Sequence, residues 1–107
     1  MALKLVTNSL VTVASAGTPV QVSTSVKMVN SVSIQASSGN TGIIYVGDSG
    51  VTAANGHELA GGEVLVINAF DKPFNLEEMD LSKLYIDAAT SADTARIISV
   101  QVDKPSN

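Results

Sequence analysis

Apolar and polar residues alternate with a period of two through the first half of the chain. From Val20 to Ala36 the even positions are mostly apolar, and the odd positions are mostly Ser, Gln or Lys. Successive side chains of a strand point to opposite faces of a sheet, so this pattern predicts strands with one face in a core. Apolar and polar positions change places between Val29 and Ser31, which predicts a break between two strands there.

Four further segments have the composition of short strands, and Gly, Asn and Ser residues separate them. They are residues 43–46, 63–68, 83–88 and 96–102. In the second of them the continuous apolar run from Val64 to Ile67 predicts burial on both faces of a sheet. In the last two we expect the inward side chains to be Leu84, Ile86, Ile98, Val100 and Val102.

Helical pattern is almost absent from the chain. One short helical turn is predicted between Phe70 and Leu81, with Asn75 as its N-cap. About eight short strands with regularly spaced turns are typical of a β-sandwich or barrel. We therefore expect an all-β fold over residues 1–107: a single small β-sandwich, jelly-roll-like, or a partly open barrel, with an extended N-terminal segment over residues 1–18.

That N-terminal segment has three interpretations. Lys4, the apolar stretch that follows it and Ala14-Ser15-Ala16 imitate a secretory signal, but polar residues interrupt the stretch. A pair of short strands or an extended arm explains the segment better. The chain has no Cys, so a disulfide framework is excluded, and a domain of 107 residues can form a core without one.

Charge is distributed very unevenly along the chain. Between Leu5 and Gly47 the only charged residue is Lys27. Charges keep an exposed β-surface soluble and discourage edge pairing, so a sheet without them is expected to be covered by a protein partner. The net charge of −4 and the lack of a basic cluster argue against nucleic acid as a partner. The apolar runs are too short for a membrane-spanning helix, so no membrane partner is expected.

Catalytic chemistry is not supported by the motifs. Gly47-Asp48-Ser49-Gly50 copies part of the sequence around the nucleophile of chymotrypsin-like proteases. A serine nucleophile needs an imidazole base and a carboxylate, which in that class precede the serine. Here the single histidine, His57, follows Ser49. We therefore predict a plain turn and a protein that is not an enzyme.

Metal and cofactor sites are not predicted either. Asp48, His57 and Glu58 offer fewer nitrogen and sulfur ligands than a zinc site uses. Glu77, Glu78 and Asp80 lack the spacing of a calcium-binding loop. No phosphate-binding loop is present.

Four segments between Val32 and Val100 form a more specific pattern. They are Ile34-Gln35-Ala36, Asn40-Thr41-Gly42-Ile43-Ile44-Tyr45-Val46-Gly47, Gly56-His57-Glu58-Leu59 with Gly62 after it, and Asp80-Leu81-Ser82-Lys83-Leu84-Tyr85-Ile86-Asp87-Ala88. This pattern resembles one found in small structural proteins and domains of tailed bacteriophages. Asn40 and Gly42 suit a turn, and Tyr45 and Tyr85 suit neighbouring strands of one sheet.

The resemblance implies a virion component, assembled in the host cytoplasm, that binds copies of itself and a larger protein lattice. A capsid decoration or cement protein fits a chain of this size best, with the major capsid protein or another virion protein as partner and a homo-oligomer, preferably a trimer, as its state. A tail, neck, baseplate or fibre accessory component, including a host-surface binder, is the alternative. The resemblance does not extend to residues 1–25, where a docking arm is expected.

The candidate contact residues come from the charge-poor half of the chain. The arm contributes Leu3, Leu5, Leu10, Val11 and Val13; a polar strand face contributes Gln21, Ser23, Ser25, Ser31, Ser33 and Gln35; and Tyr45 is added from the motif. For each position, an ordinary solvent-exposed strand residue is the alternative interpretation.

Overall fold

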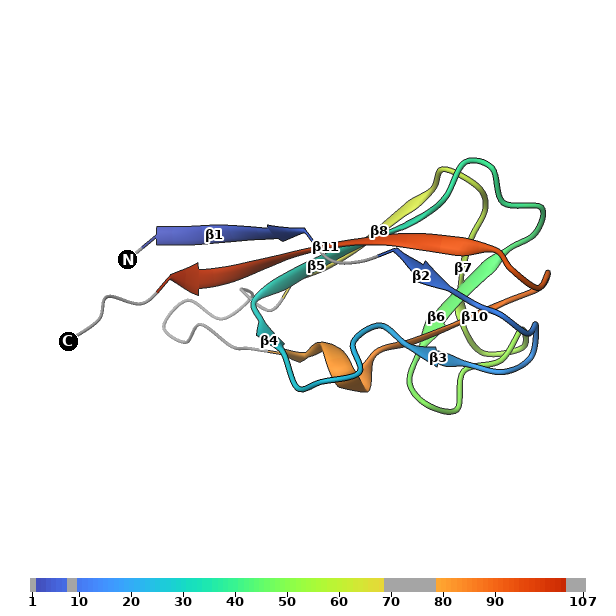
Figure 1. Cartoon of the computed structure of the whole chain (residues 1–107), viewed down its shortest axis with the longest axis horizontal. Coiled ribbons are helices and arrows are strands. Elements are labelled where there is room, and N and C mark those ends of the chain that lie inside the picture. Colours follow the sequence, from blue (N-terminus) through green and yellow to red (C-terminus); the bar gives the residue numbers. More distant parts are fainter. Residues whose placement is uncertain (1, 8–9, 69–78, 104–107) are drawn as a thin grey trace.

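Two antiparallel sheets form the body of the molecule. The computed structural model describes residues 2–7, 10–68 and 79–103 (Figure 1). The five-stranded sheet contains β1 (Ala2–Thr7), β2 (Val11–Thr12), β5 (Ser31–Ala36), β8 (Val64–Asn68) and β11 (Thr94–Asp103). The four-stranded sheet contains β3 (Val20–Gln21), β6 (Ile44–Gly47), β7 (His57–Leu59) and β10 (Tyr85–Ala88).

A two-stranded sheet and a short helix lie at one end of this arrangement. Strands β4 (Met28–Val29) and β9 (Met79–Asp80) pair with each other, and the 3-10 helix η1 (Leu81–Lys83) follows directly. Asp80 caps η1 by accepting hydrogen bonds from the backbone N–H and the hydroxyl of Ser82. Capping of this kind satisfies a backbone donor that the helix itself leaves without a partner.

Strand order places β11 inside the five-stranded sheet and β1 at its edge. The order is β1-β11-β5-β8, and β2 pairs with the beginning of β11 on the same side as β1. In Figure 1, β1 and the last part of β11 form a ribbon that extends beyond the two layers. The order of the other sheet is β3-β10-β6-β7. The predicted all-β sandwich is confirmed, and the arrangement is not a closed barrel.

The core lies between the two sheets and is aliphatic. Strand β5 alternates as predicted, with Val32, Ile34 and Ala36 buried and the intervening residues partly exposed. The register places Ile34 opposite Ile97 of β11, so both point inward. The four-stranded sheet contributes buried side chains from β6 and β10, and η1 contributes Leu81. The predicted inward positions Leu84 and Ile86 are confirmed.

The predicted orientation of β11 is wrong. Ala95, Ile97 and Ser99 are buried, whereas Ile98 is exposed. The sequence favoured the opposite phase because Ser99 and Gln101 alternate with aliphatic residues. Pairing with β5 decides the matter: once Ile97 lies opposite Ile34 on the inner face, Ile98 must point outward.

The predicted burial of β8 on both faces is also wrong. Strand β8 pairs with β5 and lies at the other end of the strand order, and its residues alternate between exposed and partly buried. Leu65 and Ile67 pack against the core, while Val64 and Val66 point outward. An unbroken aliphatic run is equally compatible with a one-sided strand whose outer face is apolar. The predicted helical turn between Phe70 and Leu81 falls mostly outside the described residues.

A cluster of hydrogen bonds holds the turn that precedes β6 against the beginning of β11. The buried carboxylate of Asp93 accepts bonds from the backbone N–H groups of Thr41 (3.0 Å) and Gly42 (2.8 Å). Asn40 exchanges two bonds with the backbone of Thr94, at 2.8 and 2.9 Å. A Cβ on Gly42 would come within 2.6 Å of the hydroxyl of Thr90 and 3.2 Å of the Cβ of Ala89, so this turn leaves little room for a side chain. The predicted turn-forming role of Asn40 and Gly42 is therefore confirmed.

The chain's own loops cover the part of the outer face of the four-stranded sheet that holds Tyr45 and Asp87, whereas Glu58 on the same face is exposed. Tyr45 points away from the core and is only 8% exposed. A Cβ on Gly56 would lie 2.7 Å from both the Cβ of Tyr45 and a methyl carbon of Val51, which shows how closely the loop between β6 and β7 approaches the sheet. On the same face, Asp87 is buried and accepts a bond from the backbone N–H of Gly17.

Replacing Asp93 by Ala should destabilise the protein by about 1–3 kcal/mol, because two backbone donors lose their acceptor. The measurement is chemical unfolding followed by circular dichroism. Asp48, an exposed turn carboxylate that accepts one bond from the backbone N–H of Gly50, provides the matched control. Asp48→Ala should change the free energy of unfolding by less than about 0.5 kcal/mol. Equal effects of the two substitutions would contradict the importance of the Asp93 cluster.

Gly56→Ala should cost about 1–3 kcal/mol, because the added methyl group overpacks the contact between the loop and Tyr45. A Cβ on Gly39 meets no atom within 4 Å, so Gly39→Ala is the control and should be near neutral. Thermal unfolding of both variants compares them directly. A Gly56→Ala protein as stable as the control would mean that the loop is not packed as closely as described.

Candidate interaction surface

The outward side chains of β1, β11, β5 and β8 form one surface, which we call the neutral face. Because paired residues of an antiparallel sheet point to the same side, the register defines its rows. The central row crosses the sheet through Val66, Ser33, Ile98 and Thr7. The row on one side of it consists of Val64, Gln35 and Arg96. The row on the other side consists of Asn68, Ser31, Val100 and Leu5.

Large aliphatic side chains on this face are exposed. The exposed fraction is 68% for Leu5, 60% for Val66, 50% for Val64 and 40% for Ile98. Leu10 is 55% exposed and joins Thr7, Arg96 and Ile98 around a shallow depression beside them. With ~3.3 Å per residue and ~4.8 Å between strands, the neutral face spans roughly 400 Å² in projection. This is about the size of the largest exposed patch that a typical monomer carries, and such patches are often functional.

Charge is almost absent from the neutral face. Among its outward residues that the structure describes, Arg96 alone carries a charge. The remaining polar groups are neutral, and the side-chain amide of Gln35 donates a hydrogen bond to the backbone carbonyl of Gly62. Neutral hydroxyl and amide groups cost less to remove from water than charged groups do. The face can therefore be covered by another protein at a small desolvation cost.

Half of the predicted polar strand face lies here. Ser31, Ser33 and Gln35 form the central column of the neutral face. Sequence reasoning missed its flanks, because Val64, Val66 and Ile98 were expected in the core. The sequence did contain a sign of this exposed surface. Strands β8 and β11 have more aliphatic residues than the inward face of each strand can hold, so some of them must point outward.

The other predicted polar residues lie on a different part of the molecule. Gln21 belongs to β3, at the edge of the four-stranded sheet, and its side chain donates a hydrogen bond to the backbone carbonyl of Ser82. The hydroxyl of Ser23 bonds to the backbone carbonyl of Ser25. These residues therefore do not form one face with Ser31, Ser33 and Gln35.

The predicted arm is a pair of short strands, β1 and β2. Leu5 and Leu10 are exposed as a contact role requires, whereas Val11 and Val13 are buried in the core. The expectation that Val11 and Val13 contact a partner is therefore wrong, because pairing of β2 with β11 turns them inward. Leu3 lies in β1 opposite Val102, and its side chain falls outside the described part of the chain.

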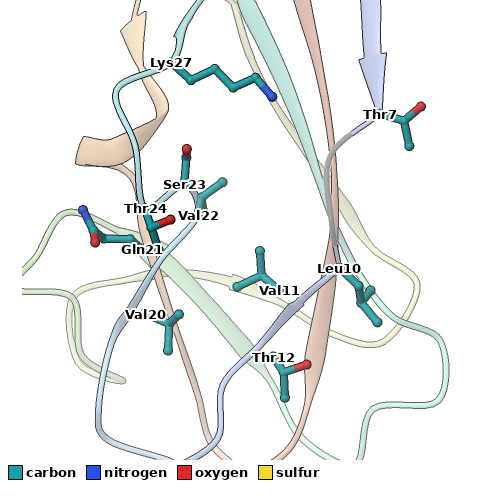
Figure 2. A pocket seen from close by; sticks show the side chains of 10 residues that line it. All are labelled: Thr7, Leu10, Val11, Thr12, Val20, Gln21, Val22, Ser23, Thr24 and Lys27. Carbon is teal, nitrogen blue, oxygen red and sulfur yellow. The ribbon is translucent and has the colours of Figure 1, made fainter.

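A groove marks the open side of the sandwich between β2 and β3. Its volume is about 450 Å³, and Figure 2 shows residues of the two chain segments that border it. The structure thus brings the predicted residues Leu10 and Val11 together with Gln21 and Ser23. Val11 and Val22, which also border the groove, are already buried, so the groove offers less apolar surface to a partner than the neutral face does.

Tyr45, the remaining predicted contact residue, is not available for binding. Strand β6 pairs with β10, so Tyr45 and Tyr85 do lie on neighbouring strands of one sheet, as expected. The loop that contains Val51 and Gly56 buries Tyr45. The predicted contact role of Tyr45 is therefore wrong, because the residue packs within the fold.

The residues with potential for chemistry are dispersed or have structural partners. Ser49 and His57 are both exposed, the first in a turn and the second in β7. The hydrogen bond from the backbone N–H of Ser82 lowers the pKa of Asp80 below its ordinary value, with help from the Ser82 hydroxyl. Within residues 2–7, 10–68 and 79–103, no group of three or more His, Cys, Asp or Glu residues could hold a metal ion.

The part of the chain that the structure describes contains no helix long and apolar enough to cross a membrane. No family model, curated protein or solved structure matches this chain significantly.

Proposed function

We propose that this protein is a structural component of a tailed-bacteriophage virion, most simply a capsid decoration or cement protein. The observation that carries the proposal is the neutral face, an exposed sheet surface with aliphatic side chains and a single charge. A free surface of this composition is a liability in a protein that stays alone in solution. Such a surface suits a protein that functions in a complex, with this surface buried against a partner.

The fold supports the same proposal through the residues of the resemblance. Asn40 and Gly42 shape the turn before β6, Tyr45 packs beneath a loop, and Asp80 caps η1. All four have scaffold roles in the sandwich, which is what a small building block of a particle requires. The motif therefore supports the class of protein, and the neutral face supplies the contact.

Stabilisation of a shell would follow from burial of the neutral face against the major capsid protein or another virion protein. Full burial of one aliphatic side chain contributes roughly 1.5–3 kcal/mol, and the neutral face offers several that are at least 40% exposed. Arg96, at one end of the face, fits a partner surface that is neutral except for one carboxylate. Such a contact bridges neighbouring subunits without a large electrostatic cost.

A tail, neck, baseplate or fibre accessory component would also bury the neutral face against a partner, and it would differ from a decoration protein only in its location in the particle. Recognition of a host-surface carbohydrate would favour exposed aromatic rings. Among the aromatic residues that the structure describes, Tyr45 is buried and Tyr85 is half-buried, so neither provides a fully exposed ring. The decoration role is therefore the preferred form of the proposal.

Val66→Lys tests the contact directly. Val66 lies on the neutral face and is already exposed, so the substitution should leave the stability of the free protein nearly unchanged. Binding to intact particles or empty shells, measured by co-sedimentation, should weaken by at least about tenfold, because one buried aliphatic contact is lost and a charge is desolvated. Val26→Lys, an equally large change at a residue that is 73% exposed between β3 and β4, is the matched control and should bind normally.

Two results would contradict the proposal. Equal binding by the Val66→Lys and Val26→Lys proteins would remove the neutral face from the contact. Failure of the unmodified protein to bind shells, tails or whole particles would remove the virion role itself.

A further inference from the structure

Strand β1 ends the five-stranded sheet and lies beside the neutral face. It pairs with β11 over its six residues, from Ala2 opposite Asp103 to Thr7 opposite Ile98. Among the strands that the structure describes, none lies on the other side of β1. Figure 1 shows this strand on the ribbon that extends beyond the two layers.

Backbone hydrogen bonds of β11 show which groups of β1 point toward the open edge. Thr94 and Val100 accept bonds from Ser37 and Asn30, on the β5 side, whereas Asp93 accepts a bond from Val13, on the opposite side. Even-numbered residues of β11 therefore bond toward β5, and odd-numbered residues bond toward β1 and β2. Since Ser99 and Gln101 lie opposite Val6 and Lys4, the backbone groups of Leu3, Leu5 and Thr7 point away from β11.

We infer that two copies of this chain associate by antiparallel pairing of their β1 strands about a twofold axis, with Leu5 opposite Leu5 of the second copy. Leu3 then lies opposite Thr7 of the second copy on each side of the axis. All three outward-directed residues find backbone partners, so the pairing forms about six hydrogen bonds. The result is one continuous sheet of two five-stranded halves.

Alternatives to this register are less favourable. Paired residues must share a face, so Leu5 can meet only Leu3, Leu5 or Thr7 of the second copy if the two neutral faces are to be continuous. Meeting Leu3 would place the two Lys4 side chains directly opposite each other, which like charges disfavour. Meeting Thr7 would leave Leu3 without a partner in β1. The Leu5 register keeps the Lys4 side chains on a diagonal, roughly 7–8 Å apart.

A second copy fits this edge because β1 is self-complementary in the Leu5 register, with Leu5 opposite Leu5 and Leu3 opposite Thr7 of the other copy. The neutral faces themselves stay uncovered in such a dimer. A twofold axis perpendicular to the sheet leaves both neutral faces on the same side and doubles the continuous surface. The pairing itself is short, so we expect a reversible dimer in solution. This inference concerns self-association, and it replaces the trimer that the resemblance implies with a dimer.

Single cysteines test the register, because the chain has no cysteine of its own. In the proposed dimer the Cα atoms of the two Leu5 residues lie about 5.5 Å apart, within the range that a disulfide spans, whereas the Lys4 positions lie beyond it. Under mild oxidation Leu5→Cys should give a disulfide-linked dimer at least about tenfold faster than Lys4→Cys. Ser49→Cys, exposed in the turn that follows β6 of the four-stranded sheet, measures random collision. Faster cross-linking through Lys4→Cys, or a Leu5→Cys rate equal to that of Ser49→Cys, would overturn the proposal.

Sedimentation provides a test that does not depend on disulfide geometry. The unmodified chain should show a concentration-dependent equilibrium between monomer and dimer. Leu5→Lys should shift it fully to monomer while the circular dichroism spectrum stays unchanged, and Val26→Lys should behave like the unmodified protein. A protein that stays strictly monomeric at about 1 mM would overturn the proposal. So would the trimer that the resemblance implies, because edge pairing about a twofold axis closes at two copies.

Discussion

The pairing of β11 on both of its sides is the interaction on which the rest of the structure depends. One side holds β5, and the other holds the consecutive strands β1 and β2, so two parts of the chain that are far from β11 in the sequence meet on this strand of ten residues. This pairing fixes the inward phase of the sheet by placing Ile97 opposite Ile34. The same constraint turns Ile98 outward and thereby creates the neutral face. The Asp93 cluster positions the beginning of β11 against the turn before β6.

Sequence patterns predicted those parts of the fold in which local and tertiary preferences agree. Strand β5 alternates strictly, and Asn40 and Gly42 have clear turn chemistry, so both were predicted correctly. Strands β8 and β11 carry aliphatic residues on both faces, so their own periodicity leaves the phase undecided. Only the register with β5 decides it, and a register is a property of two strands rather than of one. Local rules commonly fail at functional surfaces, because exposed aliphatic residues there serve a contact.

The charge-poor stretch from Leu5 to Gly47 has a different meaning in the structure than in the sequence. Its strands are divided between both sheets, and part of it, including Val11 and Val13, builds the core. The neutral face contains Leu5, Ser31, Ser33 and Gln35 from this stretch. It also contains Val64, Val66 and Ile98 from the charged half of the chain. The uncharged surface is thus produced by tertiary pairing. On the opposite sheet, loops of the chain cover the part of the outer face around Tyr45 and Asp87.

A density map of a virion assembled with this protein, the particle that we propose it belongs to, tests the central claim most directly. The molecule, fitted as a rigid sandwich, should lie with the neutral face against another protein chain, so that Ile98 and Val66 are buried and the loop over Tyr45 faces solvent. The opposite orientation, with the neutral face toward solvent and the four-stranded sheet against the particle, would contradict the account.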